Sequence, residues 1–75
     1  MTQQFIDILI RMKPDILEYK GNNLVQDGIF DSFEIVKLVT ELEEAFSIDF
    51  AASDITPENF ASPKTIWTLV ERLRT

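Results

Sequence analysis

The longest regular pattern in the chain is a stripe of apolar residues between positions 31 and 46. At about 100° per residue, these side chains fall within one arc of a helical wheel, which is typical of the buried face of an amphipathic helix. They are Ile35, Leu38, Val39, Leu42 and Phe46. Because other elements must cover this face, the pattern predicts an all-α bundle of helices.

Hydroxyl residues and prolines indicate the limits of the first helix. Thr2 is a suitable N-cap, and Pro14 disfavours helix in the residue before it, so a helix is predicted from Thr2 to about Lys13. Residues 14–28 form a long connection, in which we expect one helical turn within residues 14–19.

The same signals recur in the second half of the chain. Residues 47–53 are predicted to form a loop, and Thr56-Pro57 then predicts a short helix that ends near Phe60. Ser62-Pro63 opens a final helix with apolar residues at helical spacing, namely Ile66, Leu69, Val70 and Leu73. No repeat or linker interrupts the sequence, so residues 1–75 are interpreted as one domain.

Two absences restrict the chemistry of the chain. It contains no cysteine and no histidine, which removes disulfides, thiolate metal sites, a thiol nucleophile and the usual general base near neutral pH. We therefore expect no catalytic activity. The sequence also has no run of about 18 apolar residues and no secretion signal, so we predict a cytoplasmic protein without a membrane span.

The net charge of −6 is concentrated in one segment. Residues 27–49 hold one base, Lys37, and seven acids: Asp27, Asp31, Glu34, Glu41, Glu43, Glu44 and Asp49. Such a negative field argues against nucleic-acid binding and favours partners with basic surfaces. A solvated helix face without a partner is an equally good interpretation of the charge alone.

Phe33 and Val36 lie on the wheel opposite the apolar stripe, beside Thr40 and among charged residues. One interpretation is that residues 24–30 cover these two side chains. The other is a docking patch, in which apolar anchors provide contact area and the surrounding charges set the approach of a partner.

Ser32 lies next to this pair, at the predicted start of the helix. A serine in that place is usually the N-cap. However, Asp31 and Glu34 have the spacing of a capping box, with an acid in place of the usual hydroxyl residue. If Asp31 is the cap, the helix runs from Ser32 to about Phe46, and the Ser32 hydroxyl is free at the positive end of the helix dipole, where a phosphate is favoured.

At these residues the chain resembles the acyl carrier protein family, which includes peptidyl and D-alanyl carrier proteins. The resemblance begins with Asp31-Ser32-Phe33 at the start of the second helix and with Gly28 in the turn before it. It extends over essentially the whole chain, through residues 42–46, Ile48 and residues 55–60.

This resemblance implies a four-helix bundle with three longer helices and one short helix. It implies that a phosphopantetheinyl transferase attaches 4′-phosphopantetheine to Ser32, beside Asp31, and that the arm carries cargo as a thioester. It also implies a monomer whose partners, such as cargo-loading ligases or synthases, contact the second helix. The predicted partner-binding residues are Phe33, Glu34, Val36, Lys37, Thr40, Glu43 and Glu44.

Two differences from the pattern of fatty-acid carriers leave the identity of the cargo open. Lys37 stands where fatty-acid carriers usually have an acid, and two residues rather than one separate Gly28 from Asp31. The longer spacing is more similar to D-alanyl and other specialised carriers. Fatty, polyketide, amino and D-alanyl groups all remain candidates.

Two alternatives come from other classes of protein. Asn23, Asp27, Gly28, Asp31 and Glu34 occupy positions 1, 5, 6, 9 and 12 of an EF-hand-like calcium loop, although Val25 removes the ligand at position 3. The other alternative is an unmodified acidic adaptor, which would share the charged surface but would not need Ser32.

Overall fold

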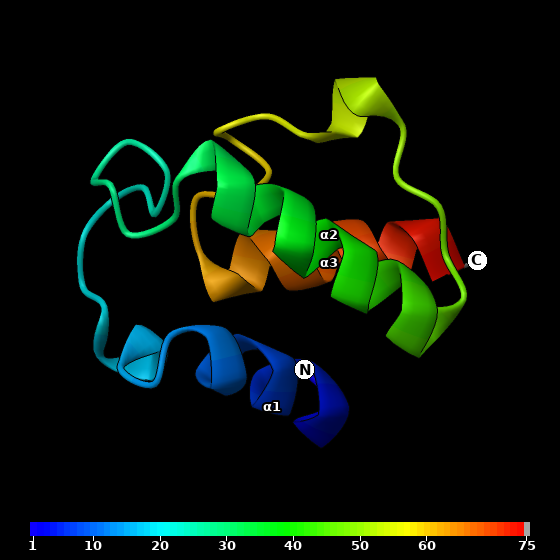
Figure 1. The fold of residues 1–75 in the computed structure, drawn as a ribbon, viewed down its shortest axis with the longest axis horizontal. Helices are drawn as coiled ribbons and strands as arrows, with labels where there is room; N and C mark the ends of the chain where they lie inside the picture. Colours follow the sequence, from blue (N-terminus) through cyan, green and yellow to red (C-terminus); the bar gives the residue numbers. More distant parts are fainter. Residues whose placement is uncertain (75) are drawn as a thin grey trace.

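The computed structural model describes residues 1–74 and contains three α-helices over that range. They are α1 (Gln3–Met12), α2 (Ser32–Phe46) and α3 (Pro63–Arg74), and short 3₁₀ turns lie at Ile16–Glu18 and Ala52–Asp54. Helices α2 and α3 run in roughly the same direction, whereas α1 runs the opposite way (Figure 1). No strand occurs among the described residues, so the all-α prediction is confirmed.

The starts of α1 and α3 follow from the side chains that cap them. The Thr2 hydroxyl accepts a hydrogen bond from the Phe5 amide at 3.3 Å, and the Ser62 hydroxyl accepts one from the Thr65 amide at 3.2 Å. Each hydroxyl satisfies an amide that has no partner within its helix. Both predicted helix starts are confirmed, and α1 ends within one residue of its predicted limit.

The core between the helices is apolar, and among the described residues no polar or charged side chain is buried. Helix α2 buries four of the five residues of its stripe, which are Ile35, Leu38, Val39 and Leu42. The fifth, Phe46, was predicted to be in the core but is only half-buried. It lies at the last turn of α2, where its ring packs against the edge of Trp67 with centroids 5.8 Å apart.

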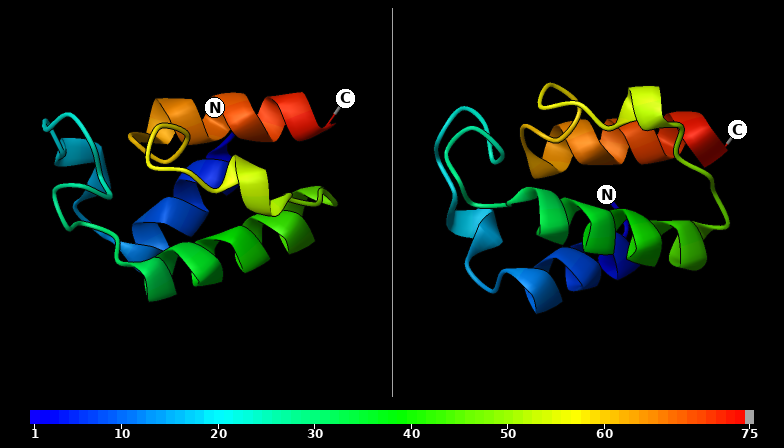
Figure 2. Two further views of the ribbon diagram at one scale, coloured as in Figure 1. Left: turned by 90° about the horizontal axis from the view of Figure 1, so that it is seen from above. Right: turned by 45° about the horizontal axis from the view of Figure 1, so that its top comes forward.

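The connection between α1 and α2 lies at the N-terminal end of α2 (Figures 1 and 2). Its expected helical turn is present at Ile16–Glu18. The Tyr19 hydroxyl donates a hydrogen bond to Asp27 at 2.5 Å and accepts one from the Asn23 amide at 2.6 Å. Asn23 in turn donates its side-chain amide to the Pro57 carbonyl at 3.1 Å. Hydrogen bonds therefore link parts of this connection to one another and to the segment before α3.

The predicted short helix at residues 56–60 is not confirmed. Thr56 does accept a hydrogen bond from the Asn59 amide at 3.1 Å, as an N-cap would, and the Phe60 amide donates to the Thr56 carbonyl at 3.1 Å. The segment stops after this single turn because Pro63 disfavours helix in the preceding residue and a new helix begins there.

The loop after α2 returns along that helix toward its N-terminal end, so residues 55–60 lie close to Ser32 (Figure 2). None of the helices described over residues 1–74 is long and apolar enough to cross a membrane.

Candidate functional site

Ser32 is the first residue of α2, and Asp31 is its N-cap. An Asp31 side-chain oxygen accepts a hydrogen bond from the Glu34 amide at 2.8 Å, and a Glu34 side-chain oxygen accepts one from the Asp31 amide at 3.2 Å. This is the predicted capping box. Ser32 is exposed, and its hydroxyl makes no hydrogen bond with any residue of the range 1–74. The hydroxyl therefore stands free at the helix start.

An ion pair fixes the start of α2 against the end of α1. The Lys13 Nζ atom lies 2.7 Å from Glu34 Oε2, and the same ammonium group lies 5.9 Å from the centroid of the Phe30 ring. The hydrogen bond from Lys13 and, secondly, the one from the Asp31 amide hold the pKa of Glu34 below its ordinary value. Glu34 is thus ionised at neutral pH and paired with Lys13, and its hydrogen bond from the Asp31 amide holds the start of α2 in place.

The two apolar residues beside Ser32 are open to solvent. Phe33 is 83% exposed and Val36 is 63% exposed, so residues 24–30 do not cover them. Ile55, which is 40% exposed, comes from the returning loop. Nothing in the sequence predicted Ile55 as a residue of the site. Its exposure depends on the path of the loop, and the only signal for it was its position in the segment that resembles carrier proteins.

A hollow of about 240 Å³ lies between the first turns of α2 and the returning loop. Its walls are mostly apolar and include Ser32; they are formed by Val25, Ser32, Ile35, Val36, Ile55, Thr56, Pro57 and Phe60. A free hydroxyl therefore adjoins an apolar depression on the surface. This arrangement offers a point of covalent attachment with an apolar surface beside it.

The structure separates the residues that were predicted to bind partners into two groups. Lys37, Thr40 and Glu44 are exposed, as are the two apolar anchors. Glu34 is engaged by Lys13, and a Glu43 side-chain oxygen accepts a hydrogen bond from the Phe50 amide at 2.9 Å. Two of the three predicted acidic contacts are therefore already used within the chain.

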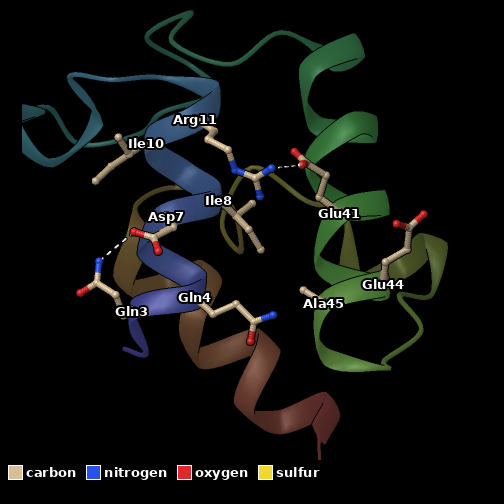
Figure 3. Close-up of a pocket in the computed structure, with 9 residues that line it drawn as sticks. All are labelled: Gln3, Gln4, Asp7, Ile8, Ile10, Arg11, Glu41, Glu44 and Ala45. Carbon is tan, nitrogen blue, oxygen red and sulfur yellow. Dashed lines mark hydrogen bonds and ion pairs between the residues drawn. The ribbon is translucent and has the colours of Figure 1, made fainter.

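A second, wider groove of about 920 Å³ runs between α1 and α2 on another side of the molecule. Arg11 reaches across it toward Glu41, with Nη1 3.6 Å from Oε1, while Glu44 points away from α1 (Figure 3). Nothing in the sequence predicted this groove. It contains no candidate for covalent attachment.

The calcium alternative is not favoured by the geometry. The Asn23 side-chain oxygen accepts hydrogen bonds from the Val25 and Gln26 amides, both at 3.0 Å. Asp27 is held by Tyr19, and Glu34 is held by Lys13. Within residues 1–74 no group of three or more acidic side chains is arranged to hold a metal ion.

Comparison with curated proteins gives relatives that span nearly the whole chain. A D-alanyl carrier protein of Staphylococcus xylosus is 31% identical over 74 residues, which cover 96% of this chain and 95% of the relative. D-alanyl carrier proteins of Bacillus mycoides and Bacillus cereus are each 32% identical over 74 residues, covering 96% of this chain and 94% of the relative. No family model matches the chain.

Proposed function

The chain belongs to the phosphopantetheine carrier protein family, and on that premise we propose that Ser32 is the residue to which its 4′-phosphopantetheine arm is attached. The observation that carries this proposal is the free hydroxyl of Ser32, which exists because Asp31 performs the capping that a serine at this place usually performs. Members of this family carry groups as thioesters and are named as carriers rather than enzymes.

The residues around Ser32 fit the group. A phosphodiester on Ser32 would lie at the N-terminus of a 15-residue helix, where unpaired backbone amides and the helix dipole favour negative charge by roughly 0.3–1 kcal/mol. The apolar hollow beside Ser32 offers surface to the arm or its cargo. When bound, the arm supplies the thiol that this cysteine-free chain lacks.

Enzymes that act on the carrier would dock beside Ser32. Phe33, Val36 and Ile55 surround the serine with exposed apolar surface, which gives a partner contact area that it can remove from water. The partners in this proposal are a phosphopantetheinyl transferase and a ligase or synthase that loads the cargo. The carrier acts as a monomer in the cytoplasm.

The names of the relatives point to one cargo to test first. The curated relatives described above are D-alanyl carrier proteins, so D-alanine is the cargo to test first on this chain. Other aminoacyl groups, fatty acyl groups and polyketides are the alternatives, and each would place the chain in a different biosynthetic pathway.

The attachment site is tested by co-expressing the chain with a broad-specificity phosphopantetheinyl transferase and measuring the mass of the intact protein. We expect one phosphopantetheine on the wild type and on Ser53→Ala, which removes another exposed serine, and none on Ser32→Ala. Modification of Ser32→Ala would place the attachment elsewhere. If the wild type also stays unmodified, the chain acts as an adaptor without an arm.

A further inference from the structure

The side of α2 that faces solvent carries five exposed residues, which we call the outward face: Phe33, Val36, Lys37, Thr40 and Glu44. At about 100° per residue they span an arc of about 100°, and the apolar stripe lies on the opposite side of the helix. An enzyme that reaches the Ser32 hydroxyl must lie over the N-terminal part of this face. Its charges therefore decide which enzymes fit.

Most acids of residues 27–49 are engaged within the chain. Of the seven, five have a hydrogen bond or ion pair inside the described range: Asp27, Asp31, Glu34, Glu41 and Glu43. Glu34 is paired with Lys13, the residue that follows α1, and Glu41 is paired with Arg11 of α1, as Figure 3 shows for Glu41. Only Glu44 and Asp49 have no such contact with residues 1–74. Hydrogen bonds to neutral groups leave a carboxylate charged, so only the two ion pairs offset part of the negative charge that a partner meets.

Lys37 is the positive charge of the outward face. It is exposed and forms no ion pair with any residue from 1 to 74, although its charge contributes to the lowered pKa of Glu34. It lies one helical turn from Phe33, which places its ammonium group beside the apolar pair. Glu41, four residues further on, is the usual ion-pair partner for such a lysine, but Arg11 holds it on the other side.

We propose that the phosphopantetheinyl transferase of this carrier presents an apolar surface to Phe33 and Val36 and a carboxylate to Lys37. The same enzyme presents a basic group to Glu44. This inference rests on the proposed attachment at Ser32. Because Lys37 and Glu44 are seven residues apart, the two complementary charges on the enzyme are separated by about 10 Å along the axis of α2. The basic partner surface expected from the sequence thereby gains one acidic group opposite Lys37.

The test is the rate at which the cognate phosphopantetheinyl transferase installs the arm from coenzyme A. Lys37→Glu is compared with Lys64→Glu, which makes the same charge change at an exposed lysine of α3. We expect kcat/KM to fall about five- to tenfold for Lys37→Glu at low ionic strength and to recover with added salt, with less than a twofold change for Lys64→Glu. Glu44→Lys should likewise be slower than Asp49→Lys, its control in the loop after α2.

The outcomes distinguish failure of the proposed contacts at Lys37 and Glu44 from failure of the proposed attachment at Ser32. If Lys37→Glu is modified as fast as Lys64→Glu, or faster, the enzyme has no carboxylate at this place and the inference is overturned, while the attachment at Ser32 stands. If the wild type acquires no arm at all, the proposed function itself fails. Thermal unfolding of all four variants by circular dichroism checks that none of these exposed substitutions has altered the fold.

Discussion

Replacing Asp31 by alanine removes the group that leaves Ser32 free. The substitution deletes the hydrogen bond to the Glu34 amide at 2.8 Å and takes a carboxylate away from the helix N-terminus. Loss of such a cap typically costs about 1 kcal/mol, and the interaction with the helix dipole adds about 0.3–1 kcal/mol at most. We therefore expect a loss of about 1.3–2 kcal/mol, which lowers the Tm of a domain of this size by about 5–16 °C.

The same reasoning assigns almost no effect to Ser32. Ser32→Ala should change the unfolding free energy by less than about 0.5 kcal/mol, because the hydroxyl is exposed and has no hydrogen bond to the described residues. Asp31→Asn should retain most of the stability because asparagine is an equally good N-cap.

Urea unfolding followed by Trp67 fluorescence and by circular dichroism measures all three variants. With a slope of about 1 kcal/mol per molar urea, Asp31→Ala should move the midpoint by about 1.3–2 M. The reasoning is wrong if Ser32→Ala loses as much stability as Asp31→Ala, since the serine hydroxyl would then be the cap and would not be free for attachment.

Three further predictions concern stability. The pKa of Glu34 is lowered in the folded protein, chiefly by Lys13. The stability that this pair contributes is therefore fully present above the ordinary pKa of 4.5, and it is lost as the pH falls from 4.5 through the lowered pKa. Lys13→Met should thus be less stable than the wild type in urea titrations at neutral pH, and the difference should disappear in acid; a difference that persists would mean that packing of the lysine stem is responsible. Phe60→Ala, at a side chain only 1% exposed, should lose about 3–5 kcal/mol and leave much of the chain unfolded by circular dichroism. Phe33→Ala should change stability by less than about 0.5 kcal/mol, and a large loss would show that Phe33 is buried in solution.

The parts of the structure that could be predicted from sequence depend on residues close together in the chain. The start of α2 is an example, because a capping box needs only an acid and a glutamate three residues apart. The caps at Thr2 and Ser62 are likewise local. These short-range rules placed Ser32 at the first position of its helix.

The parts that could not be predicted depend on contacts between distant segments. Nothing near Glu43 in the sequence shows that it will bond the Phe50 amide, and nothing near Glu41 shows that Arg11 will reach it. The exposure of Phe33 was undecided for the same reason, since it depends on where residues 24–30 pass. Counting acids therefore predicted a negative surface, but only the fold shows that Arg11 and Lys13 each offset one of these charges.

The packing of Trp67 allows folding to be observed separately from the attachment of an arm at Ser32. The chain has one tryptophan, and its ring lies 5.0 Å from that of Phe5 and 5.8 Å from that of Phe46, so all three helices meet at this fluorophore. Phe46 ends α2 and Ser32 begins it, which puts roughly 20 Å of helix between them. Native emission should consequently stay constant while an arm is added at Ser32, so the protein carries its own optical reference for integrity during that modification.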